Sequence, residues 1–287
     1  MMTCSGYYNL ATGVGVTVSI YFYCEPVPRR MSANRWSSMP VPPRVRAIGL
    51  CLGLGIVGWL TGFAATLGVE GHLLLFGYTT QTITQLASSV AFNVVGAGGL
   101  ALTYLLVRRH GFDRAFILEF LRLRKPDRWD LVWVVVGLLG AFIVAVSYQF
   151  AIDLFDPFGA GGEGTTHSGI EQGREYPLLL LLGIPIAILL TGPGEELLYR
   201  GVIQSRLTET FPTALAVVLA AVVFAAVHFP VYMGDDISAV LVSLGTVTTL
   251  GLYLGVLYEL SDNLVVPALI HGGFNAVVYL QNFLLYT

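Results

Sequence analysis

Six polar residues in the C-terminal half of the chain lie within or beside stretches that are otherwise apolar. They occur in three short patterns: Glu195, Glu196 and Arg200 in EELLYR, His228 in FAAVH, and His271 and Asn275 in HGGFN. An ionisable group at membrane depth costs roughly 2.5–3.5 kcal/mol to insert, so such residues mark a functional site by default. Carboxylate and imidazole groups can activate water, whereas imidazole and carboxamide groups can donate hydrogen bonds to a developing oxyanion.

The pattern EELLYR predicts two carboxylates with different surroundings. Residues four apart share one face of a helix, so Glu196 lies next to Arg200 and Glu195 next to Tyr199. The two glutamates are about 100° apart around the helix axis, so one can pair with the arginine while the other points elsewhere. A carboxylate without a cation can accept or hold a proton. The alternative interpretation is a water-exposed helix end that carries ordinary charges.

The pattern FAAVH places Phe224 and His228 on one face of an apolar helix. The helical runs 178–208 and 213–231 are joined by a short turn near Thr210, Phe211 and Pro212, which predicts an antiparallel hairpin. Glu195 lies about 15 residues before this turn and His228 about 17 after it, so a rise of 1.5 Å per residue puts them at nearly the same level. A carboxylate and an imidazole can therefore meet across the hairpin. A histidine that only packs inside the bundle is the alternative.

The pattern HGGFN places His271 and Asn275 on one face of the last apolar run. Gly272 and Gly273 leave that face open to close approach by a backbone or a substrate. Two hydrogen-bond donors on one face can stabilise an oxyanion. The alternative is hydrogen bonding between helices that only holds the bundle together.

Composition predicts a polytopic membrane protein. Of the 287 residues, 55% are hydrophobic and 11% are charged, whereas a soluble domain carries about 25% charged residues. The predicted fold class is all-α, a transmembrane helix bundle of seven spans, or eight if residues 7–24 form another. The apolar runs long enough to span are 47–69, 85–107, 131–152, 178–194, 213–231, 238–258 and 264–286. The fourth run continues as a helical pattern to about residue 208, with a kink expected at Gly192, Pro193 and Gly194.

The distribution of charge predicts the orientation of the chain. Of 15 basic residues, five lie in 29–46 and seven in 108–128. Both segments are expected to be cytoplasmic by the positive-inside rule. The acidic, glycine-rich segment 153–176 is then an external loop, expected to be flexible, and the C-terminus is external. The three cysteines show no paired or metal-ligand spacing.

Three regions are expected along the chain. Residues 1–46 form an N-terminal, cytoplasmic region, residues 47–177 hold the first spans and their loops, and residues 178–287 form a catalytic membrane core. The apolar segment 7–24 has three interpretations: an extra span, a signal-like segment, or an artefact of a start codon assigned too early. In the last case Met31 or Met39 is the true start.

Together the three patterns resemble the CAAX-protease and bacteriocin-processing (CPBP, or Abi) family of intramembrane proteases, which includes the Ras-converting type of CAAX prenyl endopeptidase. The family pattern is EExxx(F/Y)R followed by glycine, then FxxxH, then HxxxN. Here it occurs as Glu195 to Gly201, Phe224 to His228 and His271 to Asn275. The resemblance covers about residues 178–280, and no motif position departs from the pattern.

The resemblance implies a glutamic-type membrane endopeptidase that hydrolyses a peptide bond without a covalent intermediate. Its residue roles would be water activation by Glu195 and His228, an oxyanion hole from His271 and Asn275, and support of the site by Glu196 and Arg200. No cofactor and no metal are expected. The expected partners are membrane lipids and a peptide or (pre)protein substrate, prenylated as in CAAX processing or not, but no nucleic acid. The expected location is the prokaryotic plasma membrane.

Three other functions are consistent with the same residues. In a zinc-dependent membrane metalloprotease, Glu195, Glu196, His228 and His271 would supply ligands, although no HExxH pattern is present. In a non-catalytic bacteriocin-immunity or scaffold protein, the same fold would serve without hydrolysis. In a transporter the polar residues would form a proton relay, but the chain shows no inverted repeat.

Overall fold

The computed structural model describes residues 10–11, 17–18, 42–78, 80–233 and 236–287. The chain divides into two compact units, residues 1–41 and residues 42–287. In the first unit β1 (Leu10–Ala11) pairs antiparallel with β2 (Thr17–Val18). The interpretations of segment 7–24 and of the start at Met31 or Met39 otherwise concern residues outside the described part. The second unit is helical, which confirms the all-α prediction.

Six helices of the described residues are long and apolar enough to cross a membrane, so the protein is a multi-pass membrane protein. They are α1 (Pro43–Leu75), the continuous helix Gln81–Arg109, α5 (Arg128–Phe155), the continuous helix Pro177–Thr208, the helix Thr213–Tyr232 and α11 (Ile237–Ser261). The seventh predicted span forms α12 (Val265–Tyr286), a single 22-residue helix. It is not among the six, because polar residues such as His271, Asn275, Gln281 and Asn282 lower its mean hydropathy. The predicted count of seven or eight is therefore not confirmed.

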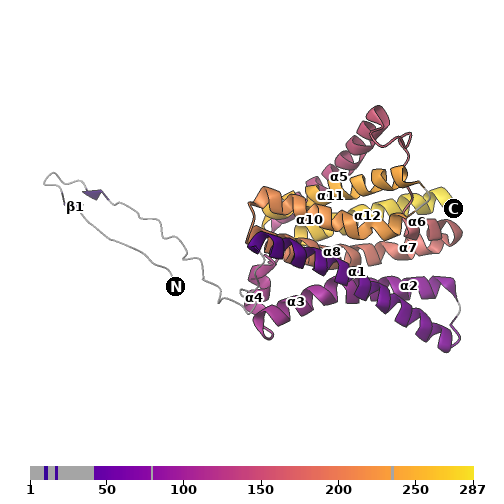
Figure 1. Cartoon of the computed structure of the whole chain (residues 1–287), viewed down its shortest axis with the longest axis horizontal. Helices are drawn as coiled ribbons and strands as arrows, with labels where there is room; N and C mark the ends of the chain where they lie inside the picture. The colour runs from indigo at the N-terminus through magenta and orange to yellow at the C-terminus, as the bar shows by residue number, and fades with distance from the viewer. Residues whose placement is uncertain (1–9, 12–16, 19–41, 79, 234–235) are drawn as a thin grey trace. The chain divides into compact units, whose positions relative to one another are not determined.

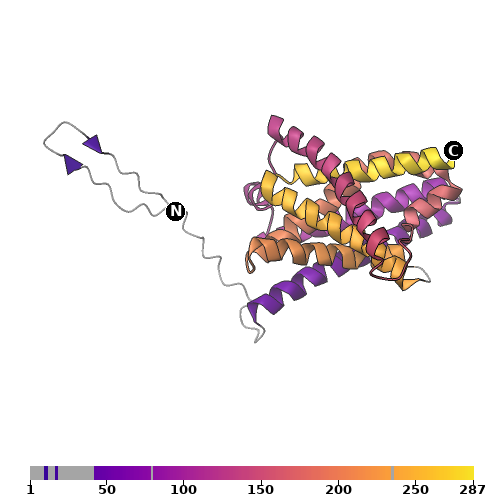
Figure 2. The same ribbon diagram turned by 90° about the horizontal axis from the view of Figure 1, so that it is seen from above.

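The helices lie side by side in the second unit, and α5 crosses them obliquely (Figures 1 and 2). The helix Gln81–Arg109 consists of α2 (Gln81–Ala91), the π-helical segment η2 (Phe92–Gly99) and α3 (Leu100–Arg109). The helix Thr213–Tyr232 consists of α10 (Thr213–His228) and the 3₁₀ turn η5 (Phe229–Tyr232). A short helix, α4 (Arg114–Phe120), precedes α5.

The helix Pro177–Thr208 changes its hydrogen-bond pattern around the glutamates. It runs through α7 (Pro177–Ile186), η3 (Ala187–Thr191), α8 (Gly192–Glu196), η4 (Leu197–Gln204) and α9 (Ser205–Thr208), where η3 and η4 are π-helical. Pro185 and Pro193 lack an N–H donor, and a proline ring clashes with the carbonyl four residues earlier, so a wider turn relieves the clash. The loosening predicted at 192–194 is thus present as π-helical turns on both sides of α8.

The glycines of α8 and α12 let these two helices touch through their backbones. A Cβ atom added to Gly192 would lie 2.7 Å from the backbone nitrogen of Gly272, and one added to Gly272 would lie 2.6 Å from the carbonyl oxygen of Ala187. Both distances are too short for a side chain, so these positions require glycine. The close approach predicted for Gly272 is confirmed, and it brings Glu195 next to His271.

A charged cluster fastens the start of α5 to the turn between α11 and α12. Arg124 donates two hydrogen bonds to the Asp130 carboxylate, at 2.7 and 2.8 Å, and a third to the Ser261 carbonyl. Asn263 donates to the same carboxylate at 3.1 Å. Such bidentate, charge-assisted bonds are strong and directional. Segment 121–127 and turn 261–264 therefore lie at the same end of the bundle. This is expected when consecutive long helices run in opposite directions, because these segments follow the second and the sixth long helix.

Part of the segment 153–176 is ordered against the bundle. It contains α6 (Ser168–Glu175), and Thr165 exchanges hydrogen bonds with Ser243 of α11 and donates one to the Tyr232 carbonyl. The Asp153 carboxylate and the Gly162 carbonyl accept hydrogen bonds from Gln149. The expectation of a flexible loop is wrong for this part, because these contacts hold it against α5, η5 and α11.

Candidate active site

Glu196 and Arg200 form a buried ion pair within the helix Pro177–Thr208. Arg200 Nη1 donates to Glu196 Oε1 at 2.7 Å, and the two side chains are 1% and 0% exposed. Arg200 Nη2 donates to the Gly251 carbonyl at 3.0 Å, and its guanidinium lies 4.7 Å from the centre of the Phe224 ring. Full burial requires this degree of compensation, since desolvating an unpaired ion is very costly. The predicted i, i+4 contact is therefore confirmed.

His271 shares the same carboxylate oxygen. Its Nδ1 lies 2.8 Å from Glu196 Oε1, the atom that also accepts from Arg200. An ionised carboxylate only accepts hydrogen bonds, so Nδ1 carries a proton and donates it. This bond fixes the ring and directs Nε2 toward Glu195. The sequence placed His271 beside Asn275 but did not predict its bond to Glu196.

His228 is oriented by its own helix. Its Nδ1 lies 2.7 Å from the Phe224 carbonyl oxygen, and a carbonyl oxygen can only accept. The proton is therefore on Nδ1, and in the neutral ring Nε2 carries a lone pair. That Nε2 lies 3.8 Å from Glu195 Oε2. The predicted meeting of Glu195 and His228 across the hairpin is confirmed.

Glu195 Oε2 is the point on which both imidazoles converge. It lies 3.8 Å from His228 Nε2 and 3.9 Å from His271 Nε2. Both distances exceed that of a direct hydrogen bond. The oxygen atom is buried, and no described residue makes a hydrogen bond to it. Two nitrogen atoms and one carboxylate oxygen thus surround a common point without bonding one another.

Phe224 packs against four members of the site. Its ring makes edge contacts with Tyr199, His228 and His271, at centroid distances of 4.8, 4.4 and 5.8 Å, and its face receives Arg200. Edge-to-face pairs and a desolvated cation over an aromatic face are favourable geometries. The Phe224 ring therefore fixes the spacing between α10, α12 and the helix Pro177–Thr208.

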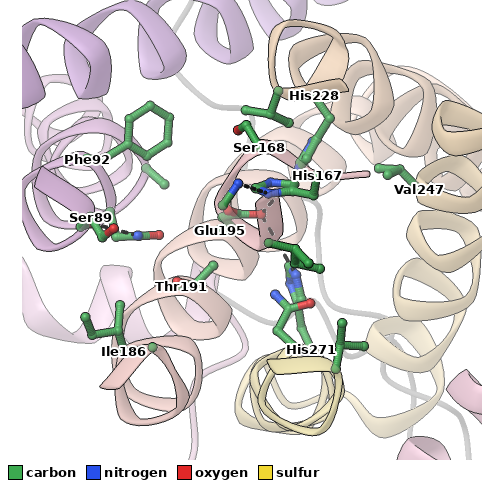
Figure 3. A pocket seen from close by; sticks show the side chains of 18 of the residues that line it. Ser89, Phe92, His167, Ser168, Ile186, Thr191, Glu195, His228, Val247 and His271 are labelled. Carbon is green, nitrogen blue, oxygen red and sulfur yellow. Dashed lines mark hydrogen bonds and ion pairs between the residues drawn. The ribbon is translucent and has the colours of Figure 1, made fainter. Parts of the chain in front are cut away.

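These residues line a cavity of about 640 Å³. Glu195, His228, His271 and Asn275 form one side of it, together with His167 from the start of α6. Figure 3 shows Glu195 near its centre, with His228, His167 and His271 on one side and Phe92 and Ser89 on the other. Asn275 lies one helical turn after His271 and is half-buried. All four residues predicted to be catalytic are therefore brought to one cavity, and the two supporting residues lie directly behind them.

Sequence reasoning did not identify His167, a third histidine of this cavity. It is the N-cap of α6, where its Nδ1 accepts a hydrogen bond from the Gly169 N–H at 3.0 Å. Its ring stands edge-on to Tyr232 at 5.4 Å. Burial and the nearby His228 imidazole lower the pKa of His167 to about 4. A loop histidine has no periodicity that could reveal it, so only the fold of segment 153–176 shows its position.

No group of three or more His, Cys, Asp or Glu side chains with a geometry that could hold a metal ion occurs in the described ranges, 42–78, 80–233 and 236–287. Of the four ligands of the zinc alternative (Glu195, Glu196, His228 and His271), Glu196 is already bound to Arg200 and His271.

The chain is similar to known proteins over the part that carries these residues. Residues 177–277 match the family described as type II CAAX prenyl endopeptidase Rce1-like. The chain is also 27% identical, over 158 residues, to "Uncharacterized protein YpbD" of Bacillus subtilis (strain 168). The aligned region covers 53% of this chain and 72% of that protein. No solved structure matches the chain.

The protein is thus a multi-pass membrane protein in which residues 177–277 are similar to type II CAAX prenyl endopeptidases. The match over residues 177–277 confirms the resemblance to CAAX-type proteases that the three sequence patterns predict.

Proposed function

We propose that this protein is an intramembrane endopeptidase in which Glu195 and His228 activate the attacking water. The observation that carries the proposal is the convergence of Glu195 Oε2 and the two histidine Nε2 atoms, 3.8 and 3.9 Å apart, inside a substrate-sized cavity. A water molecule at that point would donate one proton to Glu195 and the other to the lone pair of His228 Nε2. Its oxygen would remain free to attack a carbonyl carbon. A positioned base of this kind contributes typically 10²–10⁴-fold to the rate.

The second part of the proposal concerns the oxyanion. Attack converts the scissile carbonyl oxygen into an alkoxide, which His271 Nε2 and the Asn275 amide would stabilise. Because His271 already donates its Nδ1 proton to Glu196, it can donate from Nε2 only as imidazolium. In that form the site is electrically balanced, with two carboxylates, Glu195 and Glu196, against Arg200 and His271. Each oxyanion donor is worth about 10²–10³-fold in kcat.

Collapse of the tetrahedral intermediate completes the reaction. The proton taken up by Glu195 passes to the leaving nitrogen, the C–N bond breaks, and the alkoxide becomes the carbonyl of a new carboxylic acid. That acid becomes a carboxylate when its remaining proton leaves through His228 Nε2 to solvent. The products are a peptide with a new C-terminal carboxylate and a peptide with a new amine. No covalent bond to the enzyme forms at any step, because water itself attacks the peptide bond.

The substrate proposed is a membrane-associated peptide or protein, with C-terminal processing of a prenylated CAAX-type sequence as one form. The support is the family match over residues 177–277 and the apolar part of the cavity. There Trp59 and Phe63 of α1 stack with their rings 5.3 Å apart and 7° from parallel, next to Phe92. Such a wall suits an isoprenoid or aliphatic chain. The plasma membrane of a prokaryote is the proposed location.

Two experiments test the proposal. Mass spectrometry of membrane fractions from cells with the wild type or the Glu195→Gln variant should reveal substrates that stay uncleaved only in the variant. Identical fractions would contradict hydrolysis and favour the immunity or scaffold alternative. Purified wild type treated with EDTA or phenanthroline should retain its activity, whereas loss that zinc restores would favour the metalloprotease.

A further inference from the structure

Two buried oxygen atoms of cavity-lining side chains have no hydrogen-bond partner among the described residues: Glu195 Oε2 and Asn93 Oδ1. The first belongs to the proposed water site. The second belongs to η2, a segment about 100 residues earlier in the chain that none of the three sequence patterns includes. An unsatisfied acceptor inside a protein is unfavourable and calls for an explanation.

The orientation of the Asn93 amide follows from its neighbour. Its Nδ2 lies 2.8 Å from the carbonyl oxygen of Ser89, which can only accept a hydrogen bond. The nitrogen must therefore face Ser89, and the oxygen must face away from it. The side chain is 92% buried, since the residue is 8% exposed. Asn93 thus lines the cavity with a buried, fixed amide whose acceptor is unused.

Asn93 lies close to the helix that carries Glu195. A Cβ atom added to Gly194 would lie 3.3 Å from the Asn93 carbonyl oxygen, so η2 packs directly on α8 one residue before Glu195. Figure 3 shows its neighbours Ser89 and Phe92 across the cavity from His228 and His271, with Glu195 between them. The cavity therefore has a donor wall, from α12, and an acceptor wall, from η2.

A second acceptor extends the same wall. Glu70 of α1 lines the cavity, and its carboxylate accepts a hydrogen bond from Ser88 of α2 at 3.1 Å. Carboxylate and amide oxygens on this side can bind only N–H or O–H donors. An isoprenoid chain offers no such donor, so this wall recognises a polar part of the ligand.

A peptide backbone matches both walls at once. In a trans peptide group the C=O and the N–H point in opposite directions. If carbonyl groups face His271 and Asn275, N–H groups of the same extended segment face η2. We propose that Asn93 Oδ1 binds a backbone N–H of the substrate and so holds the peptide in register over Glu195. This inference rests on the proposed endopeptidase function and assigns a substrate-binding residue to it.

The test is a thermodynamic double-mutant cycle, in which a substitution at Asn93 is combined with the loss of one backbone N–H of the peptide and the binding affinity is measured. The probe is a farnesylated CAAX peptide and a series in which one backbone N–H at a time is replaced by an ester oxygen. Binding is measured to the Glu195→Gln variant, which should not consume the peptide, and to Glu195→Gln combined with Asn93→Leu. Asn93→Leu should weaken binding of the parent peptide by roughly fivefold to tenfold, the loss expected for one neutral hydrogen bond.

One ester analogue should show the coupling. On Glu195→Gln alone it should bind as weakly as the parent peptide binds to the double variant, and Asn93→Leu should weaken it no further. A folding defect of Asn93→Leu is separated from a true binding loss by a measurement that leaves Asn93 in place. The ester series on Glu195→Gln alone needs no change at Asn93, so one analogue should stand out there too.

Asn282→Leu is the matched control. Asn282 Nδ2 also donates to the carbonyl four residues earlier, at 2.8 Å, but its Oδ1 accepts from Tyr286 and it does not line this cavity. Its replacement should leave peptide binding unchanged. The absence of any Asn93-dependent binding, or additive losses at every ester position, overturns the inference. Cleavage that survives Glu195→Gln contradicts the proposed function instead, so the two failures are distinguishable.

Discussion

Arg200 and Glu196 offer the sharpest structural test, because their ion pair is almost fully buried. Arg200→Met keeps most of the side-chain volume but leaves the Glu196 carboxylate without its cation. Breaking a buried pair by removing one partner costs about 3–5 kcal/mol. Glu196 would still accept from His271, so the lower end of this range, about 3 kcal/mol, is expected. Total stabilities are about 5–15 kcal/mol, so folded yield should fall clearly.

Two further variants separate charge burial from lost packing. Glu196→Gln combined with Arg200→Met removes both charges and should recover part of the lost stability. Arg206→Met is the matched control: its pair with Glu209 is half-exposed, at 25% and 32%, and such pairs contribute about 1 kcal/mol or less.

The assay is unfolding of the purified protein in mixed micelles, followed by circular dichroism, with detergent extraction from membranes as a second reading. An Arg200→Met protein as stable as the wild type would refute the reasoning. A well-folded Arg200→Met protein with altered kinetics would show instead that Arg200 acts on the substrate.

Three other predictions concern the cavity. His228→Ala should fold normally but lower kcat by about 10²–10⁴-fold, because water loses its second anchor; near-normal kcat would remove His228 from the mechanism. Asn275→Ala should lower kcat by about 10²–10³-fold with little change in KM, and a change confined to KM would assign it to substrate binding. His167 has a pKa lowered to about 4, so the unfolded chain binds its proton at higher pH than the folded protein does. The wild type should therefore lose thermal stability relative to His167→Asn as the pH falls from about 6.5 to 4, and parallel curves would contradict this.

Much of the site follows from local periodicity. The pair of Glu196 and Arg200 is an i, i+4 contact, and the meeting of Glu195 with His228 follows from counting residues on either side of the turn at Pro212. Both depend only on helix geometry and chain connectivity. The close approach of Gly272 to its partner helix was also predictable, because a glycine on an apolar helix face permits backbone contact.

Other features depend on how the helices rotate against each other, which no local pattern encodes. The bond between His271 and Glu196 joins residues 75 positions apart. Asn93 reaches the cavity from a separate helix, and His167 reaches it from a segment whose glycine-rich, acidic composition suggested a flexible loop. The predicted count of seven or eight spans is not confirmed, because the polar residues of α12, which forms the seventh predicted span, lower its mean hydropathy.

The most direct test of the central claim is cleavage by purified protein in lipid nanodiscs. Wild type and Glu195→Gln are incubated in ¹⁸O-labelled water with the farnesylated CAAX peptide or with membrane proteins of the source cells. New C-termini are then detected by mass spectrometry. The proposed function predicts ¹⁸O in the new carboxylates with the wild type and at least about 100-fold less product with Glu195→Gln. Equal cleavage by both proteins would contradict the role of Glu195.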